Sequence, residues 1–157
     1  MTQSRAMRVS AKADYAVRAL TELAAADGEA MKGDAIAEAQ DIPVKFLENI
    51  LSDLRRAGVV ASRRGSDGGY WLDMPAEDVS IADVIRIVDG PLANVRGERP
   101  EDLDYTGPAT ALREVWVATR ATVRSVLEEV SIADIAAGKL PARVKQLTRE
   151  SGAWKRR

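Results

Sequence analysis

The chain has 157 residues, 46% of them hydrophobic and 30% charged, with a formal net charge of −1 and neither cysteine nor histidine. These values are typical of a single soluble domain with a sizeable core. The two missing residue types exclude disulfides, thiolate nucleophiles and cysteine-ligated zinc or iron–sulfur sites, and they remove the commonest metal ligand. An enzyme would have to use Ser, Lys, Asp or Glu, and no paired set of such residues supports one.

The hydropathy pattern predicts a cytoplasmic protein that does not enter a membrane. Its longest apolar runs are a few residues, which is too short for a membrane span. No apolar run follows the two arginines of residues 1–8, so we expect no signal peptide. If Met7 is the start, residues 1–6 are expected to form a disordered leader.

The first half of the chain has the pattern of three helices followed by a hairpin. Apolar residues recur every three or four positions in the first and third helices, which Gly28 and Gly58 end. Pro43 suits the first turn of the third helix. In chain order we expect helices over 10–27, 33–39 and 43–57, and strands over 59–64 and 70–72. This order predicts a mainly α fold with a small β-hairpin, the winged helix-turn-helix, followed by a long dimerisation helix.

The second half predicts helices around an acidic loop. We expect helices over 80–88 and 112–130, a loop over 91–109, and a last short helix that starts at Ser131. Residues 73–137 carry 6 basic and 13 acidic side chains, whereas residues 138–157 carry 7 basic and 1 acidic. A solvated, frayed terminus explains this basic tail better than a DNA-binding arm.

These patterns divide the chain into four parts. We expect a winged helix-turn-helix DNA-binding domain over 1–75, a connecting helix and acidic loop over 76–111, a dimerisation helix and short capped helix over 112–137, and a basic tail over 138–157.

One short stretch, Val-Ser-Ile-Ala-Asp, occurs twice, at residues 79–83 and 130–134. Each copy places Ser three residues before Asp, a variant of the box that caps helix N-termini. Because nothing flanking the two copies matches, two independently capped helices explain the repeat better than a domain duplication.

The third helix has an outer face suited to reading DNA. With its leucines and isoleucine turned inward, the outer side holds Lys45, Glu48, Asn49, Ser52 and Arg56. In a major groove, Lys can contact guanine or phosphate, Asn can pair with adenine, and Glu can accept from cytosine. A polar helix face with no partner is an equally good interpretation of this helix alone.

The hairpin favours DNA contact. Arg63 and Arg64 stand beside Gly65, Gly68 and Gly69, in a turn with almost no side-chain bulk. A narrow minor groove attracts arginine, and glycines let backbone N–H groups approach phosphates. An ordinary solvated hairpin is the alternative.

Several stretches resemble the Rrf2 family of bacterial transcription regulators. They are RVSAKADYAVRAL at 8–20, IPVKFLENIL at 42–51, LRRAGVV at 54–60, SRRG and GGYWL within 62–72, and the helix at 79–90. Together they cover about residues 7–90 in order. The resemblance implies homodimeric winged-helix proteins that bind pseudo-palindromic operators, mostly as repressors.

The resemblance also implies roles for individual residues. The major groove would be faced by Pro43, Lys45, Glu48 and Asn49, and the minor-groove wing would be formed by Arg63, Arg64, Gly65, Gly68 and Gly69. Ser10, Lys12 and Tyr15 would touch or support the phosphate backbone. Pro43 departs from the small hydroxyl residue common at its position, which removes one hydrogen bond.

Cluster-binding members of the family carry three cysteines after the helix that ends here at Asp89-Gly90. Without a thiol we predict no iron–sulfur cluster and no other cofactor. The loop holds an acidic set that favours a solvated segment over a metal site, namely Glu98, Glu101, Asp102 and Asp104.

The long helix after residue 111 carries a heptad-like apolar seam. Its members are Leu112, Trp116, Thr119, Val123, Val126 and Val130, flanked by Val115 and Leu127. An intramolecular core helix is one interpretation. A seam this long beyond the winged helix favours packing on a second copy across a two-fold axis.

The leading hypothesis is a homodimeric, cluster-free transcriptional regulator with double-stranded DNA as partner and a small-molecule or protein effector. The near-neutral first half and the acidic loop motivate a second hypothesis, a winged-helix module that binds and regulates another protein.

Overall fold

The computed structural model describes residues 8–156, so the predicted leader at residues 1–6 lies outside the described part of the chain. The first half contains α1 (Ala11–Ala25), α2 (Gly33–Gln40), α3 (Val44–Arg56), β1 (Val60–Arg63) and β2 (Gly69–Leu72). The second half contains α4 (Ile81–Asp89), α5 (Leu112–Leu127), α6 (Ile132–Ala137) and α7 (Ala142–Thr148). Short 3-10 turns lie at Ala76–Asp78, Pro100–Asp102 and Gly107–Ala109. The predicted fold class, mainly α with one small β-hairpin, is confirmed.

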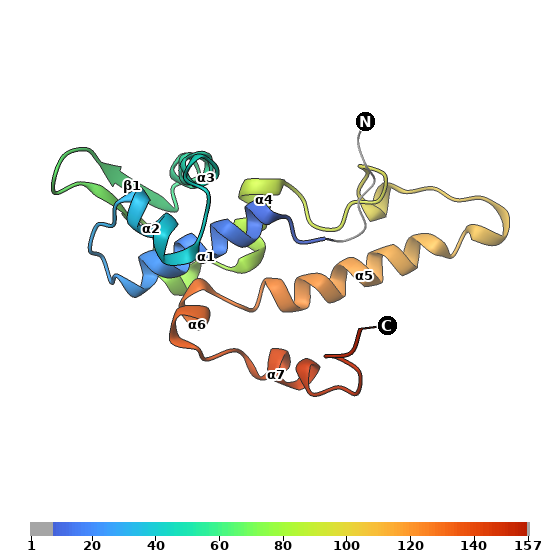
Figure 1. Ribbon diagram of the computed structural model, residues 1–157. Helices are drawn as coiled ribbons and strands as arrows, with labels where there is room; N and C mark the ends of the chain where they lie inside the picture. Colours follow the sequence, from blue (N-terminus) through green and yellow to red (C-terminus); the bar gives the residue numbers. More distant parts are fainter. Residues whose placement is uncertain (1–7, 157) are drawn as a thin grey trace.

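Helices α1–α4 and α6 pack together with the hairpin into the part of the molecule that we call the body. Helix α1 runs through the middle of this body (Figure 1). Ser10 caps its start, because the Ser10 Oγ accepts a 2.9 Å hydrogen bond from the Ala13 N–H. The alanines at 13, 16 and 19 are buried. Small side chains on these faces let α2, α3, α4, α6 and β2 all pack closely on this one helix.

The helix-turn-helix consists of α2, a tight turn and α3. Asp41 adopts a left-handed conformation with φ of 51°, and the Ile42 N–H then donates a 2.9 Å bond to the Ala37 carbonyl, which closes α2. The predicted inner face of α3 is buried, with each side chain at most 1% exposed, and comprises Leu47, Ile50, Leu51 and Leu54. The outer face of α3 is thereby fixed toward solvent.

The hairpin is antiparallel and is joined to the body by a third segment. Val60 pairs with Leu72 and Arg63 with Gly69. Met31, in the loop after α1, exchanges two backbone hydrogen bonds of 2.9 and 2.7 Å with Tyr70. These bonds hold the base of the wing beside the helix-turn-helix.

The repeated five-residue stretch begins α4 and α6. In each copy the Ser side chain accepts from the backbone of the Asp, and the Asp side chain accepts from the backbone of the Ser. The two predicted caps are confirmed, but they are not independent. The Ile81 N–H donates to the Val130 carbonyl, and the Ile132 N–H donates to the Val79 carbonyl, both at 2.9 Å. The repeat therefore marks two helix starts that pair with each other.

Two differences from the sequence prediction go beyond one or two residues at the end of an element. Helix α5 ends at Leu127 and not at Val130, because residues 128 and 129 form a turn and the backbone is extended at Ser131, the N-cap of α6. The tail predicted to be frayed contains α7, which begins after Pro141 and has no buried residue.

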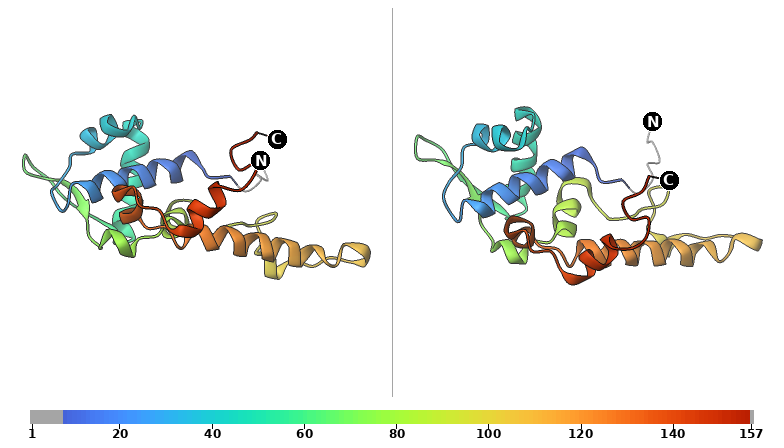
Figure 2. Two further views of the ribbon diagram at one scale, coloured as in Figure 1. Left: turned by 90° about the horizontal axis from the view of Figure 1, so that it is seen from below. Right: turned by 60° about the horizontal axis from the view of Figure 1, so that its bottom comes forward.

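The N-terminal half of α5 extends away from the body and beyond the other helices (Figures 1 and 2). Its C-terminal end returns through α6 to pack on α1. No helix within residues 8–156 is both long and apolar enough to cross a membrane.

The paired caps predict a measurable cost for losing one of them. Replacing Ser131 by Ala removes the acceptor for the Asp134 N–H, which is 3.1 Å away. We expect S131A to lower the free energy of unfolding by about 1 kcal/mol, measured by urea denaturation. The matched control is Ser151→Ala, an exposed serine outside the body. Equal unfolding midpoints for the two variants would contradict the structural role of the cap.

Candidate nucleic-acid interface

The outer face of α3 presents the side chains that the sequence singles out. Pro43, at the N-cap, and Lys45, Glu48, Asn49 and Arg56 are all exposed. Among the described residues, the side chains of Lys45, Glu48 and Asn49 form no hydrogen bond or ion pair with the chain. They are therefore available to a partner.

Two apolar side chains on the same helix were missed by the sequence analysis. Val44 is 45% exposed and Phe46 is 55% exposed. The Phe46 ring meets the Tyr15 ring edge-to-face, with centroids 6.3 Å apart. Both positions lie outside the buried stripe that contains Leu47. Their place outside this stripe was the sequence signal that could have identified them as exposed. Exposed apolar atoms beside Lys45 suit thymine methyl groups in a major groove.

The wing carries Arg63 and Arg64, both exposed. The Arg63 guanidinium donates to the Asp67 carbonyl at 3.2 Å, so the Arg63 side chain lies across the turn. Gly65 has a φ of +105° and open space around the position of a Cβ. The wing is therefore a short basic loop with little bulk at its tip.

Gly68 and Gly69 are buried, and packing within the chain accounts for both. A Cβ on Gly68 would lie 2.0 Å from the Arg63 carbonyl oxygen. A Cβ on Gly69, whose φ is +138°, would lie 2.5 Å from the Met31 carbonyl oxygen. Glycine is required at both positions for the hairpin to close and to pair with the Met31 segment.

A hollow of about 370 Å³ lies between the wing and the helix-turn-helix. Its lining includes four basic side chains, those of Lys32, Arg55, Arg63 and Arg64. The Lys32 Nζ donates to the Gly65 carbonyl, and the Arg55 guanidinium donates to the Ser62 Oγ at 3.2 Å. The predicted site omitted Lys32 and Arg55, because only folding brings them beside the wing. Four cations around one hollow suit a phosphate backbone.

The predicted residues of α1 are engaged within the chain. The Ser10 hydroxyl donates to the Asp89 carboxylate at the end of α4. The Lys12 ammonium donates to Asp53 of α3 at 2.7 Å. The Arg18 guanidinium lies over the Tyr15 ring, 4.9 Å from the ring centroid, and the Phe46 ring meets the Tyr15 ring edge-to-face. These side chains hold α1 against α3 and α4.

Asp53 of α3 is bound by two cations, Lys12 of α1 and Arg56 of α3 itself. It accepts from Lys12 at 2.7 Å and from Arg56 at 2.6 Å. The hydrogen bond from Lys12 is the main reason that the pKa of Asp53 is lowered; partial burial opposes the shift, and the charges of Lys12 and Arg56 reinforce it.

Most of the predicted seam of α5 is only partly covered by the chain. None of the residues of α5 is buried, and Val115 is 51% exposed. Leu112, Thr119, Val123 and Val126 are half-buried. The Trp116 Nε1 donates to the Tyr105 hydroxyl at 3.0 Å.

The far end of the seam packs within the chain. Leu127 packs against the core of the body, and Val130, beyond the end of α5, is buried. The partly covered part of the seam is therefore the stretch from Leu112 to Val126.

Similarity to known proteins agrees with this geometry. A family model described as Rrf2, iron-dependent transcriptional regulator, matches residues 9–138. The chain belongs to the Rrf2 family. It is thus a DNA-binding transcriptional regulator and not an enzyme, and the resemblance noted in its sequence is confirmed.

Three relatives of this Rrf2 regulator illustrate the similarity. The putative HTH-type transcriptional regulator Rv1287 of Mycobacterium tuberculosis is 56% identical over 90% of the chain and 88% of its own length. The HTH-type transcriptional regulator CymR of Bacillus subtilis is 34% identical over 83% and 90%. The solved structure of CymR, the global cysteine regulator of B. subtilis, superposes with a TM-score of 0.72 at 32% identity, covering 85% of this chain and 99% of that one.

The residues of this chain do not fit the iron chemistry in the family's description. The full sequence contains no cysteine and no histidine, so it offers neither thiolate nor imidazole ligands to an iron–sulfur cluster. Within residues 8–156, no three acidic side chains gather closely enough to hold a metal ion. The segment that follows α4 therefore offers no thiolate or imidazole with which to bind an iron–sulfur cluster.

The Lys12–Asp53–Arg56 contact predicts a pH-dependent contribution to stability. Because the folded state lowers the pKa of Asp53, its stabilisation is complete above the ordinary value and disappears as pH falls through the folded value. We expect Asp53→Asn to destabilise the protein at pH 7, and the difference from the parent protein to shrink below about pH 4.

Urea unfolding at several pH values measures this difference. The control is Glu29→Gln, which removes an exposed carboxylate that has no ion-pair partner among the described residues. A gap between D53N and the parent protein that is the same at pH 7 and pH 3 would contradict the assignment.

Proposed function

We propose that the protein is a homodimeric repressor of transcription that acts without an iron–sulfur cluster. It reads a pseudo-palindromic operator with α3 in the major groove and the Arg63–Gly69 wing in the minor groove. The observation that carries the proposal is the joint exposure, at one end of the molecule, of the α3 outer face and the arginines of the wing (Figure 1).

Groove dimensions support this placement. A major groove, roughly 12 Å wide, accepts one helix, and the side chains on its exposed side then reach base edges. Lys45 and Asn49 are donors suited to guanine and adenine, and neither has a partner among the described residues. Glu48 would repel phosphate and accept from cytosine, so its effect is mainly on selectivity.

The wing suits a narrower groove. Arg63 and Arg64 sit at a turn whose glycines leave little bulk, and the negative potential of a narrow minor groove attracts such guanidiniums. The basic hollow with Lys32 and Arg55 lies beside them and is suited to the phosphates between the two grooves.

The partly covered seam on α5, with exposed Val115 beside it, supports a dimer. A helix of 16 residues with no buried side chain gains little from the body of its own chain. Packing Leu112 to Val126 against the same stretch of a second copy would bury this apolar surface. Two copies would then present two recognition helices at a fixed spacing, as a pseudo-palindromic operator requires.

Repression follows from occupancy. A dimer that covers two half-sites within a promoter excludes other proteins from the same DNA. The regulator's own promoter region is the natural first fragment to test.

The first prediction of this proposal concerns the wing. The Arg63→Ala/Arg64→Ala variant should bind promoter DNA about a hundredfold more weakly, because each guanidinium contributes roughly 1–3 kcal/mol. The slope of log affinity against log salt should fall by about two. Fluorescence anisotropy with a labelled fragment measures both quantities.

The matched control for the wing is Arg113→Ala/Arg149→Ala, which removes the same charge from two exposed positions elsewhere. An equal loss of affinity in both double variants would mean that the effect comes from the net charge of the protein and not from the wing. Loss of the folded state in the wing variant, seen by circular dichroism, would make these arginines structural.

The second prediction concerns the seam. Val115→Glu places a charge on the exposed apolar residue that flanks the proposed contact between helices, so we expect the dimer to become a monomer. Sedimentation velocity measures the mass of each species. The control is Ala121→Glu, an exposed position on the opposite side of α5. A parent protein that sediments as a monomer, or a V115E variant that stays a dimer, would refute this interface.

A further inference from the structure

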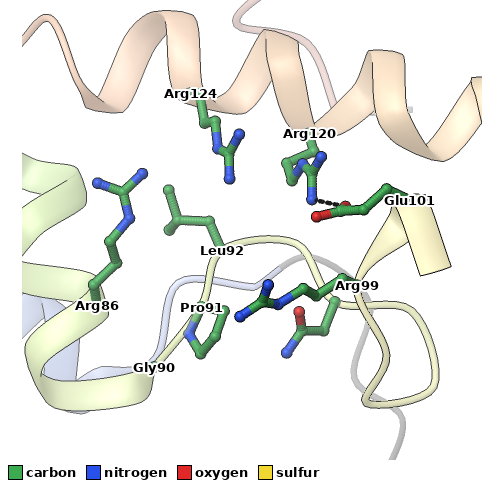
Figure 3. A pocket seen from close by; sticks show the side chains of 9 residues that line it. Arg86, Gly90, Pro91, Leu92, Arg99, Glu101, Arg120 and Arg124 are labelled. Carbon is green, nitrogen blue, oxygen red and sulfur yellow. Dashed lines mark hydrogen bonds and ion pairs between the residues drawn. The ribbon is translucent and has the colours of Figure 1, made fainter.

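A second basic hollow lies far from the wing, between α4, the segment after it and α5 (Figure 3). Its volume is about 420 Å³, which is within the range of small-molecule sites. The charged side chains that line it are Arg86, Arg99, Arg120, Arg124 and Glu101. Four guanidiniums and one carboxylate leave the lining strongly positive.

Two of the four guanidiniums are compensated within the chain. Arg86 pairs with Glu128 at 2.5 Å and with Asp83 at 3.8 Å. Arg120, with its side chain 12% exposed, pairs with Glu101. Within residues 8–156, neither Arg99 nor Arg124 has an ion-pair partner.

The guanidiniums come from three separate elements and approach one space. Arg86 extends from α4, Arg120 and Arg124 extend from α5, and Arg99 extends from the connecting segment, around Leu92 (Figure 3). Bringing like charges together is unfavourable unless an anion or a counter-charge lies between them. The planar fork of arginine matches both carboxylate and phosphate oxygens.

We propose that this hollow binds a small metabolite with two or more phosphate or carboxylate groups and is the effector site of the regulator. Arg99 and Arg124 would hold the ligand, and Leu92 and Pro91 would contact its carbon skeleton. The effector role rests on the proposed function, whereas the binding of the anion does not.

A route from this site to the DNA-reading end is present in the fold. Arg86 links α4 to Glu128 at the end of α5, so an anion beside Arg86 competes with Glu128 for the guanidinium. Helix α4 packs on both α1 and α3, and its last residue, Asp89, accepts the hydrogen bond from Ser10. A shift of α4 against α5 is therefore transmitted to the helices that set the position of α3.

Binding is tested first, without DNA. Calorimetric titration of the full-length protein with pyrophosphate and with citrate, at constant ionic strength, should give saturable binding of one probe per chain. Arg99→Gln/Arg124→Gln should weaken binding about tenfold or more, because two charge-assisted contacts are lost. Arg113→Gln/Arg149→Gln should leave it unchanged.

A second variant separates this hollow from the DNA-binding face, which is also basic. Arg63→Ala/Arg64→Ala should bind the probes as the parent protein does. If the probes bind only where the wing is intact, the anion site is the DNA face and the proposal fails. If neither probe binds at all, for example because acidic side chains of a second copy fill the hollow, the proposal also fails.

The effector role is tested with promoter DNA. The tighter-binding probe should change the DNA affinity of the parent protein and leave that of Arg99→Gln/Arg124→Gln unaffected at the same ionic strength. A probe that binds in the hollow without changing DNA affinity would overturn the effector role. Absence of specific DNA binding in the parent protein would instead overturn the proposed function and leave the calorimetric result standing.

Discussion

The close packing of α2, α3, α4, α6 and β2 on α1 is the constraint on which the rest of the structure depends. Ala13, Ala16 and Ala19 present faces with almost no side-chain volume, and each is at most 1% exposed. Interaxial distances between helices depend on the side chains at the contact, so small residues allow the shortest ones. A larger side chain at any of the three positions would displace at least one of α2, α3, α4 and α6. The position of α3 and that of α6, which follows α5 in the chain, are thus both set by the same helix.

The local elements and the exposed outer face of α3 could be predicted from the sequence because they depend on short-range patterns. The stripe on α3, the turn glycines and the two Ser-to-Asp caps all act within a few residues. The pairing of Val79 with Ile132, and the approach of Lys32 to the wing, could not be predicted, because each joins segments that only the tertiary fold brings together. Gly68 and Gly69 illustrate the same limit. Their presence in a turn was evident, but the backbone atoms that exclude a side chain became identifiable only in the folded chain.

Charge is distributed in this protein in a way that its net value of −1 conceals. Cations gather at the wing and, separately, around the hollow between α4 and α5. On α1 and α3, Lys12 and Arg56 share one carboxylate, Asp53, so part of the positive charge beside the outer face of α3 is compensated within the chain. At the second hollow, Arg99 and Arg124 have no such counter-charge among the described residues. Compensation by an internal carboxylate distinguishes a supporting cation from one that is available to a ligand.

The backbone pairing between the starts of α4 and α6 has a mechanical consequence. It fixes the point at which α5 leaves the body, and α5 spans about 24 Å from that point at 1.5 Å per residue. A rotation of about 5° at the junction would move the far end of the helix by about 2 Å. In a symmetric pair of such arms the two displacements combine, whereas the half-sites on B-DNA lie at a fixed repeat of about 34 Å. In the proposed dimer, the stiffness of these two backbone hydrogen bonds would therefore limit how far the spacing of the two α3 helices can depart from the repeat of B-DNA.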